Sequence, residues 1–322
     1  PFCTVEPNLA SVPVPDDRLQ AIAALTNPEK VIPDTITFTD IAGLVRDAHQ
    51  GEGLGNQFLA QVAEANALLH VVRCFHDDNV AHVDGTPEPV RDMETINTEL
   101  LLHDLGTVER YVHKLERQAK GQKQPPAALA PAQDLLAHLD QAQAAAGFYA
   151  AHEDAADLLH ELHLLSTKTQ IICANTDDDA GDTDADAPLQ EHCRAHALEL
   201  VSIPARLEAE LIELDDEEKQ EFRRDYGYAE GALPRLILAG HRALDLITFF
   251  TIQSDRVQAW HIPAQTPAPA AAGKIHSDFE AGFIRAQVIA CDDFRAHGSE
   301  SACRDAGVVR TEGKDYLVQD GD

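Results

Sequence analysis

Two short loops of the sequence carry residue types that suit phosphate and purine chemistry. The first is Asp40-Ile-Ala-Gly43, which follows a run of threonines alternating with apolar residues. An aspartate at the end of a strand can hold Mg²⁺, usually through water, and a glycine lets its backbone N–H approach a γ-phosphate. Because D-x-x-G is a short pattern, an ordinary turn is the alternative for this loop.

The second loop is Asn175-Thr-Asp-Asp178, which comes directly after another apolar run. An N-x-x-D loop in this place can read the edge of a purine base through its acid, Asp178. The alternative is a loop that is simply rich in aspartate, since several more aspartates follow as far as position 186. The order of the two loops, each behind a strand-like run, favours nucleotide binding for both.

The elements that position these loops have the patterns of a mostly parallel sheet. Residues 35–41 alternate threonine with apolar residues, whereas 68–75 and 169–174 are short apolar runs typical of buried parallel strands. Residues 198–203 form a fourth such run. Helical stretches, including 56–67, separate the strands, which indicates βαβ units and an α/β fold.

A helical insertion interrupts the α/β pattern over residues 98–167. Its apolar residues step by four and three positions and form a heptad seam, made of Leu101, Leu105, Val108, Val112 and Leu115. A second stretch rich in Ala and Leu follows after a break at 121–126. We expect a coiled-coil hairpin here, with two ordinary surface helices as the alternative.

The C-terminal part of the chain has the sequence pattern of a separate small domain. Residues 247–252 and 257–262 indicate a β-hairpin. The predicted elements after it are a Pro/Ala loop at 263–272, a short helix at 277–283 and a strand at 286–290. We therefore expect an α+β domain over 245–322, leaving 1–97 and 168–244 for the α/β domain.

A cluster of bases lies at the expected tip of the helical hairpin. Five bases and one acid, Glu116, occur within fourteen residues, the bases being Arg110, Lys114, Arg117, Lys120 and Lys123. The default interpretation is a solvated helix face. The functional one is a docking patch for ribosomal RNA or an acidic protein surface, for which a few phosphate contacts would suffice.

The overall composition argues against several other functions. The chain has 55 acids and 25 bases, a formal net charge of −30, which disfavours a generic DNA-coating protein and a polybasic membrane binder. Its six cysteines form no C-x-x-C pair, which gives a zinc or redox site little support. The sequence has no run of 18 apolar residues and no visible signal peptide, so a cytoplasmic protein without membrane association is expected.

Motifs in order along nearly the whole chain strongly resemble the YchF subfamily of Obg-type P-loop GTPases, also called Obg-like ATPases. The segments that carry the resemblance include Pro1–Asn8, Asp40–Val45, Gly51–Phe58, Val71–Phe75, Ile96–Leu100, Leu214–Glu218, Ala272–His276, Phe279–Gln287 and Glu312–Tyr316. The resemblance implies a GTPase-type domain with a coiled-coil insertion, followed by a TGS domain of ubiquitin-like fold. The family's last strand would lie beyond Asp322.

The resemblance also implies roles for individual residues. Thr4 and Asp40 match Mg²⁺ ligands, and Gly43 matches the γ-phosphate contact. Leu44 stands where Ras-like enzymes have a water-orienting glutamine, so hydrolysis must be assisted by another residue. His82 matches a histidine suspected of that role, and the alternative for His82 is a solvated loop histidine. The residues that match base contacts are Asn175, Asp178 and Ala205, and Asp178 replaces the glutamate usual in the subfamily.

One element of P-loop GTPases does not occur in the sequence. No G-x-x-x-x-G-K-[ST] motif is present, and in such enzymes that loop precedes the first strand seen here. The expected function is a Mg²⁺-dependent switch that binds and hydrolyses ATP or GTP and associates with ribosomes. The alternative is a nucleotide-incompetent module that binds RNA, ribosomes or protein through the helical arm and the TGS domain.

Overall fold

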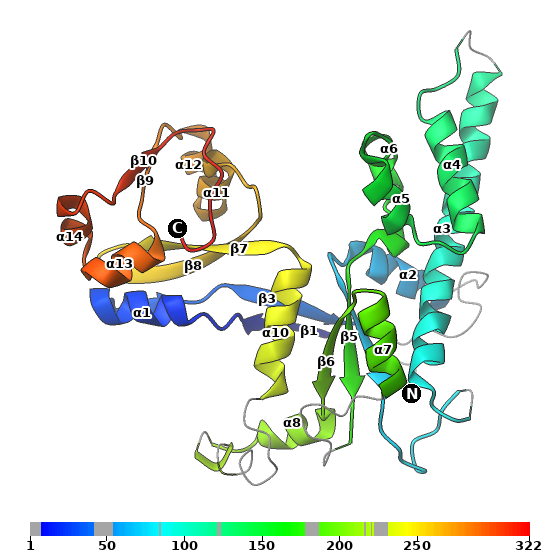
Figure 1. The fold of residues 1–322 in the computed structure, drawn as a ribbon, viewed down its shortest axis with the longest axis horizontal. Coiled ribbons are helices and arrows are strands. Elements are labelled where there is room, and N and C mark those ends of the chain that lie inside the picture. The colour runs from blue at the N-terminus through cyan, green and yellow to red at the C-terminus, as the bar shows by residue number, and fades with distance from the viewer. Residues whose placement is uncertain are drawn as a thin grey trace. The chain divides into compact units, whose positions relative to one another are not determined.

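The computed structural model divides the chain into two compact units, which we describe separately (Figure 1). The first unit contains residues 1–9 and 39–233, and the second contains residues 10–38 and 234–322. The residues that the structure describes are 8–41, 54–83, 85–120, 124–177, 187–215, 217–219, 221 and 231–322.

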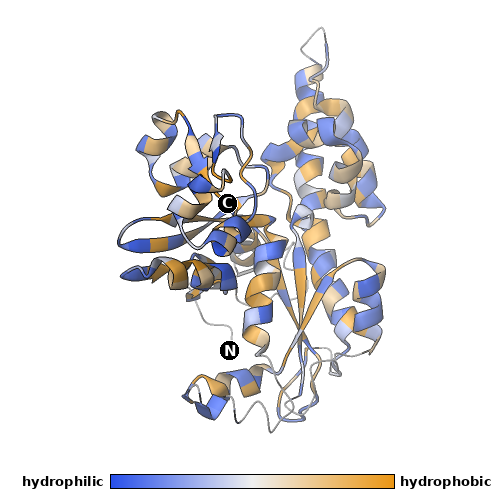
Figure 2. Cartoon of the chain, turned by 60° about the vertical axis from the view of Figure 1, so that its left-hand side comes forward, coloured by the Kyte–Doolittle hydropathy of each residue, from blue (hydrophilic) through white to orange (hydrophobic). Residues whose placement is uncertain are grey.

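A three-stranded parallel sheet forms the centre of the first unit. Its order is β4 (Leu68–Arg73), β5 (Gln170–Asn175) and β6 (Glu199–Ile203). The central strand β5 has four consecutive buried residues, which explains its continuous apolar sequence. Figure 2 shows the hydrophobic colour along the strands of this sheet. The strands predicted at 68–75, 169–174 and 198–203 are thereby confirmed, within one or two residues at their ends.

Helices supply the apolar side chains that bury this sheet. The helix α7 (Ala187–Ala195) contributes Leu189 and Cys193 to a cluster that contains Val72 and Ile172 of the strands. The helix α2 (Leu54–Glu64) contributes Leu59 and Val62 to a second cluster. The short helix α8 (Ala205–Leu211) follows directly after β6.

The first unit has a helical arm that begins at Pro89, earlier than the predicted start at 98. The arm consists of the long helix α3 (Pro89–Ala119), which packs against α4 (Leu129–Asp140), and of two short helices, α5 (Ala145–Ala151) and α6 (Glu153–Leu159). The heptad seam is confirmed, because Val108, Val112 and Leu115 are buried against α4. The chain returns to the sheet through the 3₁₀ turns η2 (His160–Leu162) and η3 (Leu165–Thr167).

A buried carboxylate fixes the point where the arm returns. Asp104 of α3 is fully buried and accepts hydrogen bonds from the backbone N–H groups of Leu165 (2.8 Å) and Ser166 (2.7 Å). It also accepts from the Ser166 hydroxyl at 2.7 Å. Because all three donors belong to the returning segment, Asp104 ties η3 to the middle of α3.

The second unit combines segments from both ends of the chain. Its three-stranded sheet has the order β2 (Lys30–Ile32), β8 (Arg256–Pro263) and β7 (Leu246–Ile252). The β7–β8 pair is the predicted antiparallel hairpin, whereas β2 pairs parallel with β8. Two smaller pairs are β1 (Asn8–Pro13) with β3 (Thr35–Asp40), and β9 (Ala286–Val288) with β10 (Arg310–Glu312).

The helices of the second unit include one that corrects the sequence analysis. Residues 263–272 are not a loop throughout, because α11 covers Ala268–Ile275. Its alanines favour a helix, and proline is tolerated in a first turn because the N–H groups there lack intrahelical partners. The other helices are α1 (Asp17–Thr26), α10 (Ala232–Ala243), α12 (Ser277–Ala281), α13 (Cys291–His297) and α14 (Glu300–Asp305).

Among the described helices, none is both long and apolar enough to cross a membrane.

Candidate functional site

The carboxyl ends of the three parallel strands bring two of the predicted base-contacting residues together. Asn175 ends β5 and lies in register with Ile203 of β6. The side-chain oxygen Oδ1 of Asn175 accepts a hydrogen bond from the backbone N–H of Ala205 at 3.2 Å. The loop after β5 and the start of α8 are therefore joined at one sheet edge, where open α/β sheets bind ligands.

Backbone contacts hold this edge in register. The N–H of Thr176 donates to the carbonyl of Ile203 at 3.0 Å, and the N–H of Cys74 donates to the carbonyl of Asn175 at 2.8 Å. Thr176 is buried, so its side chain anchors the root of the loop. The orientation of Asn175 thus follows from the sheet itself.

Arg73, which the sequence analysis missed, organises the loop after β4. Its guanidinium donates hydrogen bonds to the carbonyls of Phe75, Asp77 and Val80, at 3.3, 3.0 and 3.0 Å. It also lies over the Phe75 ring, 4.5 Å from the centroid. An arginine that ends an otherwise apolar strand was the available signal. This arginine shapes the loop that carries His82.

His82 is held by a carboxylate. Its Nε2 lies 3.0 Å from Oδ2 of Asp92 in the first turn of α3, and the two side chains are 16% and 19% exposed. The same Asp92 oxygen accepts a hydrogen bond from the N–H of Glu88 at 3.1 Å. The alternative of a solvated loop histidine is therefore wrong, and Asp92 is a second residue that the sequence analysis missed.

Asp40 belongs to the first unit, near the start of its segment 39–233. It is the last residue of β3 and is exposed, whereas the next residue, Ile41, packs against Leu59, Val62 and Leu100 of the first unit. The other predicted site residues Thr4, Gly43, Leu44 and Asp178 fall outside the described residues.

Comparisons with known proteins were made at the level of both sequence and structure. The chain is 44% identical to the ribosome-binding ATPase YchF of Escherichia coli O157:H7, over 100% of the chain and 89% of that protein. It is 37% identical to Obg-like ATPase 1 of Gallus gallus, over 100% of the chain and 83% of that protein. This chain belongs to the YchF/Obg-like ATPase family.

Family models and a solved structure agree with this assignment. A model described as a 50S ribosome-binding GTPase matches residues 1–102, and the YchF-GTPase_C model, described as a protein of unknown function, matches residues 246–322. The structure of the Schizosaccharomyces pombe YchF GTPase superposes with a TM-score of 0.81 at 30% identity, covering 100% of this chain and 88% of that one. The predicted fold class, a P-loop GTPase-type α/β domain with a further C-terminal domain, is thereby confirmed.

The sheet of this YchF-family chain also contains two groups that burial keeps neutral. Burial lowers the pKa of His70 on β4 to about 4 and raises the pKa of the Cys173 thiol on β5 to about 11. Both groups are uncharged near neutral pH. The charged and polar groups of the site are thus those at the strand ends.

The helical arm carries a basic stripe, which we define as Arg110, Lys114 and Arg117 of α3 together with Lys120, the residue that caps its end. All four side chains are exposed, and the steps of four, three and three residues place them on the helix face opposite the buried seam. The guanidinium groups of Arg110 and Arg117 donate back to carbonyls of their own helix, those of Gly106 and His113. Lys123, the fifth predicted base, lies outside the described residues.

The described residues can be tested for their fit to Mg²⁺. Among them, no group of three or more His, Cys, Asp or Glu side chains could hold a metal ion. Mg²⁺ at nucleotide sites is commonly held by only one or two protein oxygens, with waters and phosphates completing its octahedron. The exposed carboxylate of Asp40 fits this kind of site.

Proposed function

We propose that the chain carries the switch domain of a Mg²⁺-dependent purine-nucleotide hydrolase, acting on ATP, GTP or both, that associates with ribosomes. The observation that carries the nucleotide part is the hydrogen bond from Ala205 N–H to Asn175 Oδ1 at the carboxyl edge of the sheet. Family membership supports the activity, since named relatives are ribosome-binding ATPases. The proposal places the protein in the cytoplasm.

Base recognition would use the Asn175 loop. Because Asn175 Oδ1 accepts from Ala205, the amide NH₂ group of Asn175 is the end available to donate to a purine. Asp178 would accept from the base, and its carboxylate is the guanine-type acid. Thr176, which stands where many GTPases have a lysine, is part of the core.

The phosphate and metal end of the site would use Thr4, Asp40 and Gly43. Thr4 and Asp40 would hold Mg²⁺, and the Gly43 N–H would donate to the γ-phosphate. When bound, the ion supplies charge neutralisation on the β- and γ-phosphates. Loss of the γ-phosphate would release the loops that contain Thr4 and Gly43, which gives the protein two states.

His82 would assist hydrolysis in place of a glutamine. Leu44 has no polar atom with which to orient water. Asp92, whose Oδ2 lies 3.0 Å from His82 Nε2, would fix the orientation of the imidazole ring.

Ribosome association would use the basic stripe and the C-terminal domain. The stripe stands out against a net charge of −30, because four exposed cations share one helix face. Such a row suits the phosphate backbone of ribosomal RNA. We further propose that the C-terminal domain is a TGS domain, with domain boundaries at 98, 168 and 245.

Nucleotide binding is tested by titration calorimetry with Mg–ATP and Mg–GTP. The chain is used as it stands and also joined at its amino end to a strand and loop carrying G-x-x-x-x-G-K-[ST], because this motif is not among the 322 residues. We expect micromolar binding and turnover in the joined form, and we expect Asp40→Ala to abolish that turnover. Undiminished kcat in Asp40→Ala would show that Asp40 does not hold the Mg²⁺ needed for hydrolysis.

The alternative function predicts a different result. A nucleotide-incompetent module would bind neither nucleotide in either form, yet would still co-sediment with ribosomes. Its binding would depend on the helical arm and the C-terminal domain and would not respond to added nucleotide.

A further inference from the structure

Arginines lie at both ends of the segment that carries His82. Arg73 is the last residue of β4, and Arg91 lies in the first turn of α3, within the same unit. The described residues between them, 74–83 and 85–88, form neither helix nor strand. Because such a stretch has no hydrogen-bond ladder of its own, its path depends on side chains that bond to its backbone.

Arg73 fixes the part of the segment that precedes His82. Its Nε, Nη2 and Nη1 each donate to a different carbonyl, those of Phe75, Asp77 and Val80. The Asp77 carbonyl also accepts from the N–H of Val80 at 3.2 Å, which closes a turn. One planar guanidinium with donors in a fixed fork therefore sets the backbone path up to two residues before His82.

Arg91 fixes the part that follows His82, together with Asp92. Its Nη2 donates to the carbonyl of Thr86 at 2.7 Å and to Oδ1 of Asp92 at 3.1 Å, and its Nη1 contacts Oε2 of Glu88 at 3.0 Å. The other Asp92 oxygen, Oδ2, faces His82 Nε2 and accepts from the N–H of Glu88. Since both oxygens are engaged, the carboxylate cannot turn away from His82 without losing charge-assisted hydrogen bonds.

The segment begins at the sheet edge that carries the proposed base contact. Arg73 lies in register with Asn175, and the N–H of Cys74 donates to the carbonyl of Asn175. The loop of His82 and the loop of Asn175 therefore start side by side on neighbouring strands of one sheet, which is where open α/β sheets bind ligands.

We infer that Arg73 and Arg91 are positioning residues for hydrolysis, which hold the His82 imidazole where it can orient the attacking water. This inference rests on the proposed nucleotide function. Arg73 acts through the backbone before His82, and Arg91 acts through Asp92. Because both act through His82, their loss should lower kcat and leave KM unchanged.

The first test needs no nucleotide and uses the chain as it stands. Arg73→Lys keeps the charge, but its single ammonium group cannot reproduce the fork that serves three carbonyls. We expect hydrogen exchange about tenfold faster at the amides of Asn79 and Val80, which bond to Asp77, and unchanged exchange in β5 and β6.

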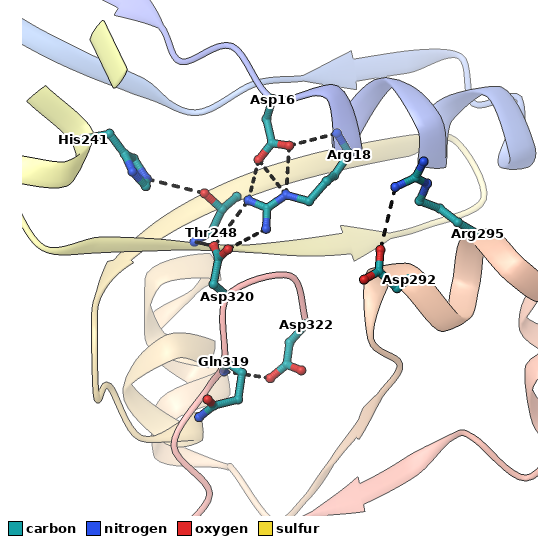
Figure 3. Close-up of polar contacts among 9 residues, drawn as sticks. All are labelled: Asp16, Arg18, His241, Thr248, Asp292, Arg295, Gln319, Asp320 and Asp322. Atoms are coloured by element: carbon teal, nitrogen blue, oxygen red, sulfur yellow. Dashed lines mark hydrogen bonds and ion pairs between the residues drawn. The ribbon is translucent and has the colours of Figure 1, made fainter. Parts of the chain in front are cut away.

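The matched control is an arginine of the second unit. Arg295 pairs with the exposed carboxylate of Asp292 at 3.7 Å on α13 (Figure 3). Arg295→Lys should leave exchange at Asn79 and Val80 unchanged, because it makes the same chemical change away from the His82 loop.

The second test uses the joined form that carries a phosphate-binding loop, followed by single-turnover hydrolysis. We expect Arg73→Lys and Arg91→Lys each to lower the rate about tenfold with KM unchanged, and Arg295→Lys to have no effect. Each substitution is then repeated together with His82→Ala. It should cause no further loss there, because the group that it positions is gone.

The outcomes separate the inference from the function on which it rests. Equal losses with and without His82 indicate a merely structural role and overturn the inference, as do an unchanged rate or unchanged exchange in Arg73→Lys. If Arg73→Lys does not fold, Arg91→Lys decides in its place. If the unsubstituted joined form hydrolyses no nucleotide, the proposed function fails and the positioning role fails with it, whereas the exchange experiment still decides whether Arg73 orders residues 75–80.

Discussion

At the scale of single residues, carboxylates and amides that accept backbone hydrogen bonds organise this protein. Asn175 accepts from Ala205, Asp34 from His261, and Asp104 from Leu165 and Ser166. In each case the acceptor and its donor come from different elements. A carboxylate such as Asp34 or Asp104 makes stronger hydrogen bonds in this role than a neutral acceptor, because its charge assists them.

His82 provides the prediction at this scale. In the joined form that carries a phosphate-binding loop, we expect His82→Ala to lower kcat by about 10²–10⁴ with little change in KM, as for loss of a general base. Asp92→Asn should lower kcat less, because the imidazole remains.

The control for His82 lies in the same loop. His76 also faces a carboxylate, Asp78 at 3.4 Å, but the two side chains are 81% and 95% exposed. His76→Ala should therefore leave kcat unchanged. Equal rates for the His82 and His76 variants would show that His82 has no catalytic part.

At the scale of elements, the long helix α3 has two faces with different tasks. Its seam buries Val108, Val112 and Leu115 against the rest of the arm, and its opposite face presents the basic stripe. The seam follows from the heptad spacing, whereas the stripe is a charge pattern with no packing role. Substitutions on the two faces should therefore separate stability from binding.

We predict that charge reversal of the stripe weakens ribosome binding without unfolding the arm. Lys114→Glu, Arg117→Glu and Lys120→Glu together should reduce co-sedimentation strongly. They should also reduce the slope of log K against log salt by about three, because about three phosphate contacts are lost. The control reverses Arg194, Arg295 and Arg304, which carry the same charge and are exposed. Binding that survives reversal of the stripe but not of the control would contradict the prediction.

The sheet provides a second prediction, on pH. The pKa of His70 falls from 6.5 to about 4 because burial disfavours its charged form. Below pH 6.5 the unfolded chain binds a proton that the folded chain does not. Stability from this group is therefore complete above pH 6.5 and declines as the pH falls toward 4, by at most about 1.4 kcal/mol per unit.

Urea unfolding at pH 7.5, 6 and 5 measures this effect. His70→Gln removes the titrating group and keeps a polar partner for Gln170, so its stability should fall less with acidification than that of the unsubstituted chain. His76→Gln, at an exposed position, is the control. Parallel pH profiles for His70→Gln and the unsubstituted chain would exclude His70 as the cause.

At the scale of the whole molecule, the net charge of −30 is the dominant feature. Like charges repel in the compact state, and salt screens them over a Debye length that falls from ~30 Å at 0.01 M to ~8 Å at 0.15 M. The charge does not exclude a nucleic-acid partner, because the basic stripe locally reverses its sign.

We expect Tm to rise with NaCl, and most of the rise to come below ~0.5 M, where the Debye length changes most. Sodium sulfate at matched ionic strength is the control. An equal effect of the two salts indicates screening, whereas a larger effect of sulfate indicates exclusion from the protein surface. A Tm independent of NaCl would show that self-repulsion does not limit stability.

The sequence predicted those features that leave a local pattern. The strands at 68–73, 170–175 and 199–203, the seam of α3 and the hairpin of β7 and β8 follow from apolar runs, heptad spacing and alternation. Asn175 was also predicted, because it follows a recognisable strand-like run, whereas Ala205 was predicted through the family resemblance. The resemblance to the YchF family rests on motifs of the same local kind.

Contacts without a recognisable sequence pattern required the tertiary structure. Arg73 and Asp92 act through backbone and side-chain partners that no spacing rule identifies. The helix Ala268–Ile275 was read as a loop because prolines at its start look like a loop signal.

The position of residues 10–38 is the clearest case. Asp34 and His261 are 227 positions apart. A parallel pair such as β2–β8 is not joined by a short turn, so no turn sequence predicts the pairing. Residue types and local periodicity determine which segments become strands and which loops can hold a nucleotide. Which segments pair is decided by the burial and hydrogen bonding that the whole chain gains at once. The sequence by itself therefore determined the nucleotide motifs, and only the tertiary structure showed that residues 10–38 form one unit with residues 234–322.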